Sequence, residues 1–211
     1  MNVTVPHGLP RDVIIFNFVP QLRLLQNPKL MTADNLLIDP KNPLLPYASP
    51  NGEICDSLSG HVYRDAYKRM ISNPECQLFV PIIQWIDRTS VTGNDRFLLK
   101  PYMSTPAIFK ETFCRTIQAW GYHGFIPKQK TSLAQNQTQI EGNNICNYHA
   151  KLYAVLHSFT IAGPQLCNGM LPLGPNGVIC VDIIICILFV IQDLQQGDAL
   201  CGRYGLHTTG I

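Results

Sequence analysis

Charged side chains are scarce in this sequence of 211 residues, at 14% against the roughly 25% of an ordinary soluble domain. The 16 Lys and Arg residues nearly balance the 14 Asp and Glu residues, which gives a formal net charge of +2. This balance excludes a polybasic nucleic-acid arm and an acidic disordered tail, although it leaves room for a small DNA-contacting patch. Hydrophobic residues make up 46%, which is enough apolar surface to bury a core.

The sequence also lacks any CxxC pair, although it contains eight cysteines: Cys55, Cys76, Cys114, Cys146, Cys167, Cys180, Cys186 and Cys201. Zinc knuckles need two thiolates close together in the chain, so this spacing argues against one. The first residues, MNVTVPHGLPRDV, have neither the basic nor the apolar region of a secretion signal. We therefore expect an intracellular protein, not secreted, whose thiols are reduced and mostly buried.

No apolar run reaches the roughly 20 residues that a membrane-spanning helix needs. The longest, Val178 to Ile191, has 14 residues and contains Asp182. Its many β-branched residues favour a strand buried on both faces, and no membrane partner is expected. A protein attached to a membrane through this segment stays open as a less favoured alternative.

Prolines divide the first part of the chain, which predicts an extended N-terminal arm over residues 1–75 because each proline limits helix length. Three short helices are expected in this arm, over 18–25, 32–37 and 59–72. The third would present Val62, Ala66 and Met70 on one apolar face.

Residues 76–211 are expected to form the main domain. The patterns predict strands over 77–87, 96–102 and 107–109, a loop rich in aromatic residues over 121–127, an exposed mobile segment over 128–144, a helix over 147–162 and a buried strand over 178–191. Pro81 fits poorly in a central strand, because it has no N–H to donate. The order of strands and helix predicts an α/β fold.

Two carboxylates follow apolar strands in this order: Asp87 after VPIIQWI and Asp193 after ILFVIQ. If the two strands are neighbours, both acids lie at one edge of the sheet, where their repulsion would favour binding of a cation. Carboxylate oxygens suit Mg²⁺ or Mn²⁺, and pairs of such ions serve phosphoryl-transfer nucleases. Two other interpretations remain: simple solvent-exposed strand ends, and Asp182 in place of Asp193 as the functional acid.

The segment FVPIIQWIDRTSVTGNDRFLLKPYMSTPAIFKETFCRTIQAWGYHGFIPK resembles the start of the catalytic domain of Plavaka-like DNA transposases, of the Kyakuja–Dileera–Zisupton group. The preceding QNPKLMTADNLLIDPKNPL and SGHVYRDAYKRMISNPECQLFVPII are similar to that family's lead-in. Asp87-Arg88-Thr89 matches the position of the first acid, and the segment from Asp193 to Cys201 matches the position of the second.

This resemblance implies a partial ribonuclease-H-like core, a mixed sheet with flanking helices, truncated at its C-terminus and preceded by the proline-rich arm. Asp87 and Asp193 would be catalytic acids and ligands of Mg²⁺ or Mn²⁺, and Arg88 and Thr89 would support the first acid. The family's third acid, a Glu on a later helix, has no candidate here, so strand transfer by this chain alone is not expected. The implied partners are DNA, at transposon ends, and a related full-length transposase, and the implied location is the nucleus.

The same features leave a second hypothesis, a non-catalytic remnant or interaction protein derived from a transposable element. Under this hypothesis Asp87 and Asp193 would form no metal site, unlike in the transposase hypothesis.

Overall fold

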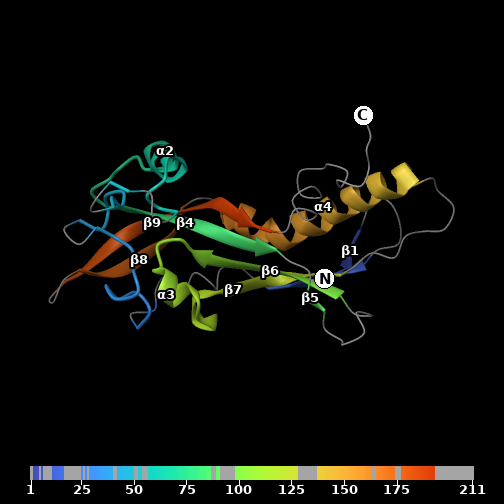
Figure 1. Cartoon of the computed structure of the whole chain (residues 1–211), viewed down its shortest axis with the longest axis horizontal. Coiled ribbons are helices and arrows are strands. Elements are labelled where there is room, and N and C mark those ends of the chain that lie inside the picture. Colours follow the sequence, from blue (N-terminus) through green and yellow to red (C-terminus); the bar gives the residue numbers. More distant parts are fainter. Residues whose placement is uncertain are drawn as a thin grey trace.

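A seven-stranded mixed sheet forms the centre of the molecule in the computed structural model (Figure 1). The structure describes residues 2–4, 6, 11–16, 25, 27, 29–39, 42–49, 52–53, 57–86, 89–90, 98–127, 137–162, 165–173 and 177–192. The strands are β1 (Asn2–Val3), β2 (Arg11–Asp12), β3 (Ile14–Ile15), β4 (Gln77–Ile86), β5 (Thr89–Ser90), β6 (Leu98–Pro106), β7 (Gly121–Pro127), β8 (Gln165–Leu173) and β9 (Gly177–Ile191). The helices are α2 (His61–Met70), α3 (Glu111–Cys114), the short 3-10 helix η2 (Ile117–Ala119) and α4 (Gln137–Ala162).

The strand order in the large sheet is β3-β7-β6-β4-β9-β8, with β5 paired to β6. Strands β4, β6 and β7 form an antiparallel meander, whereas β9 runs parallel to β4. A parallel neighbour requires a crossover, and α4 lies in the connection between β7 and the β8–β9 hairpin. These features confirm the predicted α/β fold.

Strand β4 contains Pro81 and is nevertheless central, with β6 on one side and β9 on the other. Its pairing with β6 begins only at Ile82, and the Pro81 carbonyl accepts a hydrogen bond from the Ala107 N–H at 2.7 Å. The N–H and C=O of one residue in a strand point to the same side, so the missing donor of Pro81 faces the end of the β6 ladder. The proline is tolerated because it costs no bond to β9.

The long strand predicted over 178–191 is confirmed as β9, and Val181, Ile183, Ile184 and Ile185 are buried. Among the described residues, no helix is both long enough and apolar enough to cross a bilayer.

The helix predicted over 147–162 is also confirmed, but α4 begins ten residues earlier, at Gln137. The expectation of a mobile segment is therefore wrong for residues 137–144, while 128–136 lie outside the described residues. The error arose because this stretch lacks apolar periodicity, although residues such as Gln are good helix formers.

Residues 121–127 are strand β7, so the predicted loop is wrong. The glycine at position 124 fits the strand because the neighbouring elements pack closely against it. A Cβ there would lie 2.4 Å from the Ile14 carbonyl oxygen and 3.3 Å from Val155 Cγ2. The glycine lets β3 and α4 approach β7 closely.

Two other short elements also differ from expectation. Residues 107–109 leave the sheet, because the chain turns after Pro106, and only Phe109 forms an isolated bridge, to Leu36. Residues 32–37 form turns instead of a helix, because the Leu37 N–H donates to the Ile108 carbonyl at 2.6 Å. Of the helix expected over 18–25, residues 18–24 lie outside the described residues.

Helix α2 confirms the helix predicted over 59–72, and its predicted apolar face is confirmed for Ala66 and Met70 but not for Val62. Val62 is exposed, while Tyr63 is buried and Tyr67, Ala66 and Met70 pack beside it against the core. The Tyr67 hydroxyl donates to the Leu44 carbonyl at 2.9 Å, and the Tyr63 ring stacks on Phe79 of β4.

Residues before position 76 contribute to the core of the sheet. Leu25, Met31, Leu36, Leu44 and Leu58 are buried in the same cluster as Leu78, Phe79 and Val80 of β4. Earlier in the chain, β3 also belongs to the sheet, where it pairs with β7.

Candidate functional site

The two strands that precede the candidate acids are adjacent and parallel. Trp85 of β4 is paired with Ile191 of β9, and these residues lie two positions before Asp87 and Asp193 in the chain. Asp87 and Asp193 themselves, and Arg88, lie outside the described residues. The condition on which the sequence argument depended, that the two strands be neighbours, is therefore met.

Asp182, the competing acid, lies at the opposite end of the same strand pair. It is exposed, it is paired with Gln77 at the start of β4, and its backbone N–H donates to the Cys76 carbonyl at 2.8 Å. Eight residues of β4 separate Gln77 from Trp85, which is about 26 Å at about 3.3 Å per residue. Asp182 is therefore remote from the edge at which β4 ends.

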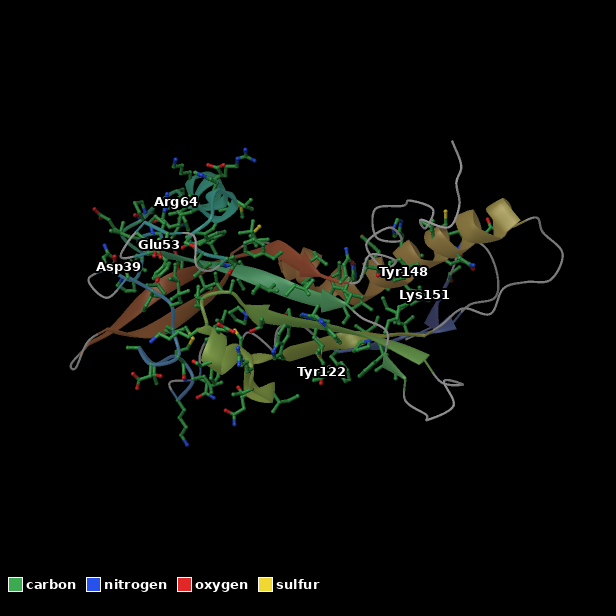
Figure 2. The ribbon with its side chains drawn as sticks, in the orientation of Figure 1. Asp39, Glu53, Arg64, Tyr122, Tyr148 and Lys151 are labelled. Carbon is green, nitrogen blue, oxygen red and sulfur yellow. The ribbon has the colours of Figure 1, made fainter. Side chains whose placement is uncertain are left out.

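Helix α4 packs against β7, β3 and β1, and it shares a buried cluster with the end of β4. Ile86, the last residue of β4, is fully buried in one cluster with Tyr102 of β6 and with Tyr148 and Leu152 of α4. The Lys100 Nζ lies 5.0 Å from the centre of the Tyr148 ring, which is a cation–π distance. Figure 2 shows Tyr148 and Lys151 on α4, in the right-hand part of the view.

Buried polar side chains lie on neighbouring strands close to this helix. The Tyr102 hydroxyl donates to Gln84 Oε1, and burial, with Tyr148 nearby, raises the pKa of Tyr102, so the hydroxyl keeps its proton. His123 Nε2 and Ser104 Oγ are 2.6 Å apart. Burial lowers the pKa of His123 to about 4, which makes its ring neutral near pH 7.

A buried amide oxygen at the end of β9 bears on whether a cation fits. Gln192 Oε1, next to Asp193 in the chain, is buried and has no hydrogen-bond partner among the described residues. Amide and carboxylate oxygens are both hard donors, which is the kind that Mg²⁺ and Mn²⁺ prefer. Within the described ranges, no three His, Cys, Asp or Glu side chains gather as a metal site.

Four cysteines whose side chains the structure describes are free thiols, and three of these are half-buried: Cys76, Cys114 and Cys186. Burial raises the pKa of the Cys114 and Cys186 thiols, which makes both weak nucleophiles. Cys146, on α4, is exposed, so the expectation of buried thiols does not hold there.

Sequence reasoning missed the polar residues beneath α4. Asn147 and Lys151 of α4 and His123 of β7 are all buried, and the local pattern around Asn147 and His123 does not distinguish them from surface positions. One signal was available: Lys151 falls on the helix between Tyr148 and Leu152, so it borders the apolar stripe.

Comparisons with protein-family models, with curated proteins and with solved structures found no match to this chain.

Proposed function

We propose that this chain is the front part of a transposase catalytic core of the ribonuclease-H-like type, with Asp87 and Asp193 as two of its metal-binding acids. The observation that carries the proposal is the parallel pairing of β4 with β9, in which Trp85 stands opposite Ile191. It gives both acids the same distance in the chain from one edge of the sheet.

The order of elements supports the same proposal. The resemblance implies a first acid on the first strand of the core and a second acid at the end of the fourth. Here β4 begins an antiparallel meander with β6 and β7, α4 follows, and β9 returns beside β4 in parallel. Strand β8 is then an addition that forms a hairpin with β9 at the sheet edge.

The chemistry proposed for the site is cleavage and joining of DNA strands at transposon ends, which assigns the protein to the nucleus. Mg²⁺ or Mn²⁺, when bound, would activate the attacking oxygen and stabilise the leaving oxygen. The carboxylates of Asp87 and Asp193, with Gln192 Oε1 beside them, would hold the ion. Arg88 and Thr89 would support the first acid, and Thr89 begins β5, which pairs with β6.

A third acid, expected on a helix, would complete such a site. No Glu follows Asp193 in this sequence. The 211-residue polypeptide by itself is therefore expected to bind divalent cations weakly and to show no strand transfer, because a two-acid site leaves its ions with too few ligands.

The test is a titration of the full chain with Mn²⁺, followed by electron paramagnetic resonance. Asp87→Asn and Asp193→Asn should each weaken Mn²⁺ binding by more than about tenfold, because each removes a charged ligand. Asp182→Asn is the matched control, since it removes an acid from the far end of the same strand pair, and it should leave binding unchanged. Equal Mn²⁺ affinity in all four proteins would reject the metal site and favour the non-catalytic hypothesis.

A further inference from the structure

A row of apolar side chains crosses one face of the large sheet. Tyr122, Met103, Trp85 and Ile191 are paired in succession across β7, β6, β4 and β9. Directly paired residues project from the same face of a sheet, so these four side chains form one continuous row. Tyr122 and Ile191, at its two ends, are exposed, and the two residues between them are half-buried.

This row lies on the side of the sheet away from α4. Tyr102, the neighbour of Met103 in β6, is buried in one cluster with Leu152 of α4. Successive side chains of a strand point to opposite faces, so Met103 and the rest of its row face the other way. In Figure 2, Tyr122 lies below the strands of the sheet and Tyr148 of α4 lies above them.

Three more apolar side chains extend the row toward the edge of the sheet. Ile14 of β3 is paired with Phe125 of β7, whose ring stacks on Tyr122 and meets Phe16 edge to face, with 6.1 Å between ring centroids in both pairs. Ile14 is 53% exposed and Phe16 is 42% exposed. Neither hydrophobic cluster of the described residues includes any member of this surface. We call it the outer face, and it consists of Ile14, Phe16, Trp85, Met103, Tyr122, Phe125 and Ile191.

The outer face is large enough to hold two protein molecules together weakly. A large side chain has about 150–250 Å² of surface, so each of the four exposed members presents roughly 70–100 Å². With the half-buried members, the outer face offers about 500 Å² of apolar surface in each molecule. Two such faces in contact would bury about 1,000 Å², which is the lower limit for a specific interface.

The chemistry of the outer face favours a second copy of this chain as its partner. None of the seven residues is charged, and they are aromatic, aliphatic or Met. Single-stranded nucleic acid needs Lys or Arg beside the stacking rings, and none is among these residues. Homodimer interfaces are more apolar than other interfaces, and interfaces in general are enriched in aromatic residues and Met. An uncharged apolar surface is also complementary to itself, as a two-fold axis requires.

We infer that the outer face is a homodimer interface, through which two copies pack sheet against sheet about a two-fold axis. Sheets packed face to face lie about 10 Å apart, with their side chains interdigitated. Helix α4 is then on the outside of the dimer. The inference is independent of the proposed function, because it uses neither Asp87 nor Asp193. The modest area predicts a dissociation constant in the micromolar range.

The first experiment is sedimentation velocity of the full chain, diluted from about 100 μM to about 1 μM, over which the dimer should dissociate. Tyr122→Lys should raise the dissociation constant by more than about tenfold, because it brings one lysine from each copy into an apolar interface. Ile14→Lys, nearer the edge of the sheet, should act in the same direction.

The matched control is Tyr153→Lys, which makes the same change at an exposed tyrosine of α4, and it should leave the dissociation constant unchanged. A chain that stays monomeric at every concentration overturns the inference. So does a dimer that Tyr122→Lys and Ile14→Lys leave intact, or one that Tyr153→Lys weakens as much as they do.

The second experiment places the contact on the sheet without adding charge to it. The chain has two tryptophans, so Trp120→Phe leaves Trp85 of the outer face as the single fluorophore. Quenching of Trp85 by acrylamide should fall several-fold as the protein concentration rises through the dissociation constant, because the second copy covers the ring. Equal quenching at all concentrations overturns the inference: weak quenching throughout would mean that the chain itself covers this face, and strong quenching that the face stays open.

Discussion

His123 is a neutral imidazole held inside the sheet, with 2% of its surface exposed and Ser104 Oγ at 2.6 Å from its Nε2. Its ring meets Tyr102 edge to face, at 5.6 Å between centroids. The bulge between Tyr102 and Met103 in the β6–β7 ladder places this histidine between the two paired positions. His123 of β7 therefore contacts two residues of β6: Ser104 through a hydrogen bond and Tyr102 through ring packing.

The pKa of His123, lowered by burial to about 4, makes stability depend on pH. An unfolded chain binds this proton below about pH 6.5, whereas the folded chain does not until about pH 4. Stability should therefore fall as the pH drops from 7 to 4, by up to about 3 kcal/mol from this residue. Urea unfolding measured across this range checks the slope.

The control for that slope is His61, an exposed histidine of α2. His123→Gln should flatten the dependence of the unfolding free energy on pH, and His61→Gln should preserve it. If His123→Gln and the wild type keep the same slope, the buried ring is not the group that titrates.

At the scale of one element, α2 is held to the sheet by the face that carries Tyr63. Tyr63→Ala should lower the free energy of unfolding by about 3 kcal/mol, because it removes a buried ring that stacks on Phe79. Val62→Ala, one residue earlier on the exposed face, should change it by less than about 0.5 kcal/mol. Chemical denaturation of both variants checks the pair, and a larger loss of stability in Val62→Ala than in Tyr63→Ala would contradict the packing of α2 through Tyr63.

The long elements were predictable because their patterns are continuous. Strand β4, the strand β9 and the later half of α4 each carry an apolar run or stripe that one local rule recognises. The sequence argument assumed, but could not predict, that the strands preceding Asp87 and Asp193 are neighbours, since nothing in the sequence specifies which strands pair.

The failures belong to elements whose structure depends on distant partners. Strand β7 was predicted as a loop rich in aromatic residues, and its contacts with β6, Ile14 and Val155 explain why Gly124 suits a strand. Residues 32–37 were predicted to form a helix, but they form turns in which the Leu37 N–H donates to the Ile108 carbonyl. Lys151 was missed for the same reason, because its burial depends on how α4 meets the sheet.

At the scale of the whole molecule, the residues before position 76 and the sheet share one core. Leu36 is buried and forms a bridge to Phe109, and its neighbour Leu37 is hydrogen-bonded to Ile108. Asn35 accepts from the Lys110 N–H at 2.8 Å, so three consecutive residues of the early chain bind the turn that follows β6. Such a junction links the unfolding of the two parts.

Leu36→Ala should therefore lower the free energy of unfolding by about 2–5 kcal/mol, as large-to-small changes in a core do. Because the early residues pack directly on β4 and the turn after β6, the loss should appear in the whole chain as one shifted transition, not as early melting of residues 1–75. Tryptophan fluorescence reports Trp85 of β4 and Trp120 before β7, and circular dichroism reports the helices, so both midpoints should move together. The exposed Leu45→Ala serves as the control and should leave both unchanged. If the fluorescence midpoint stays in place while circular dichroism shifts, the residues before 76 form a separate unit, and the sheet with its two acid-bearing strands is stable without them.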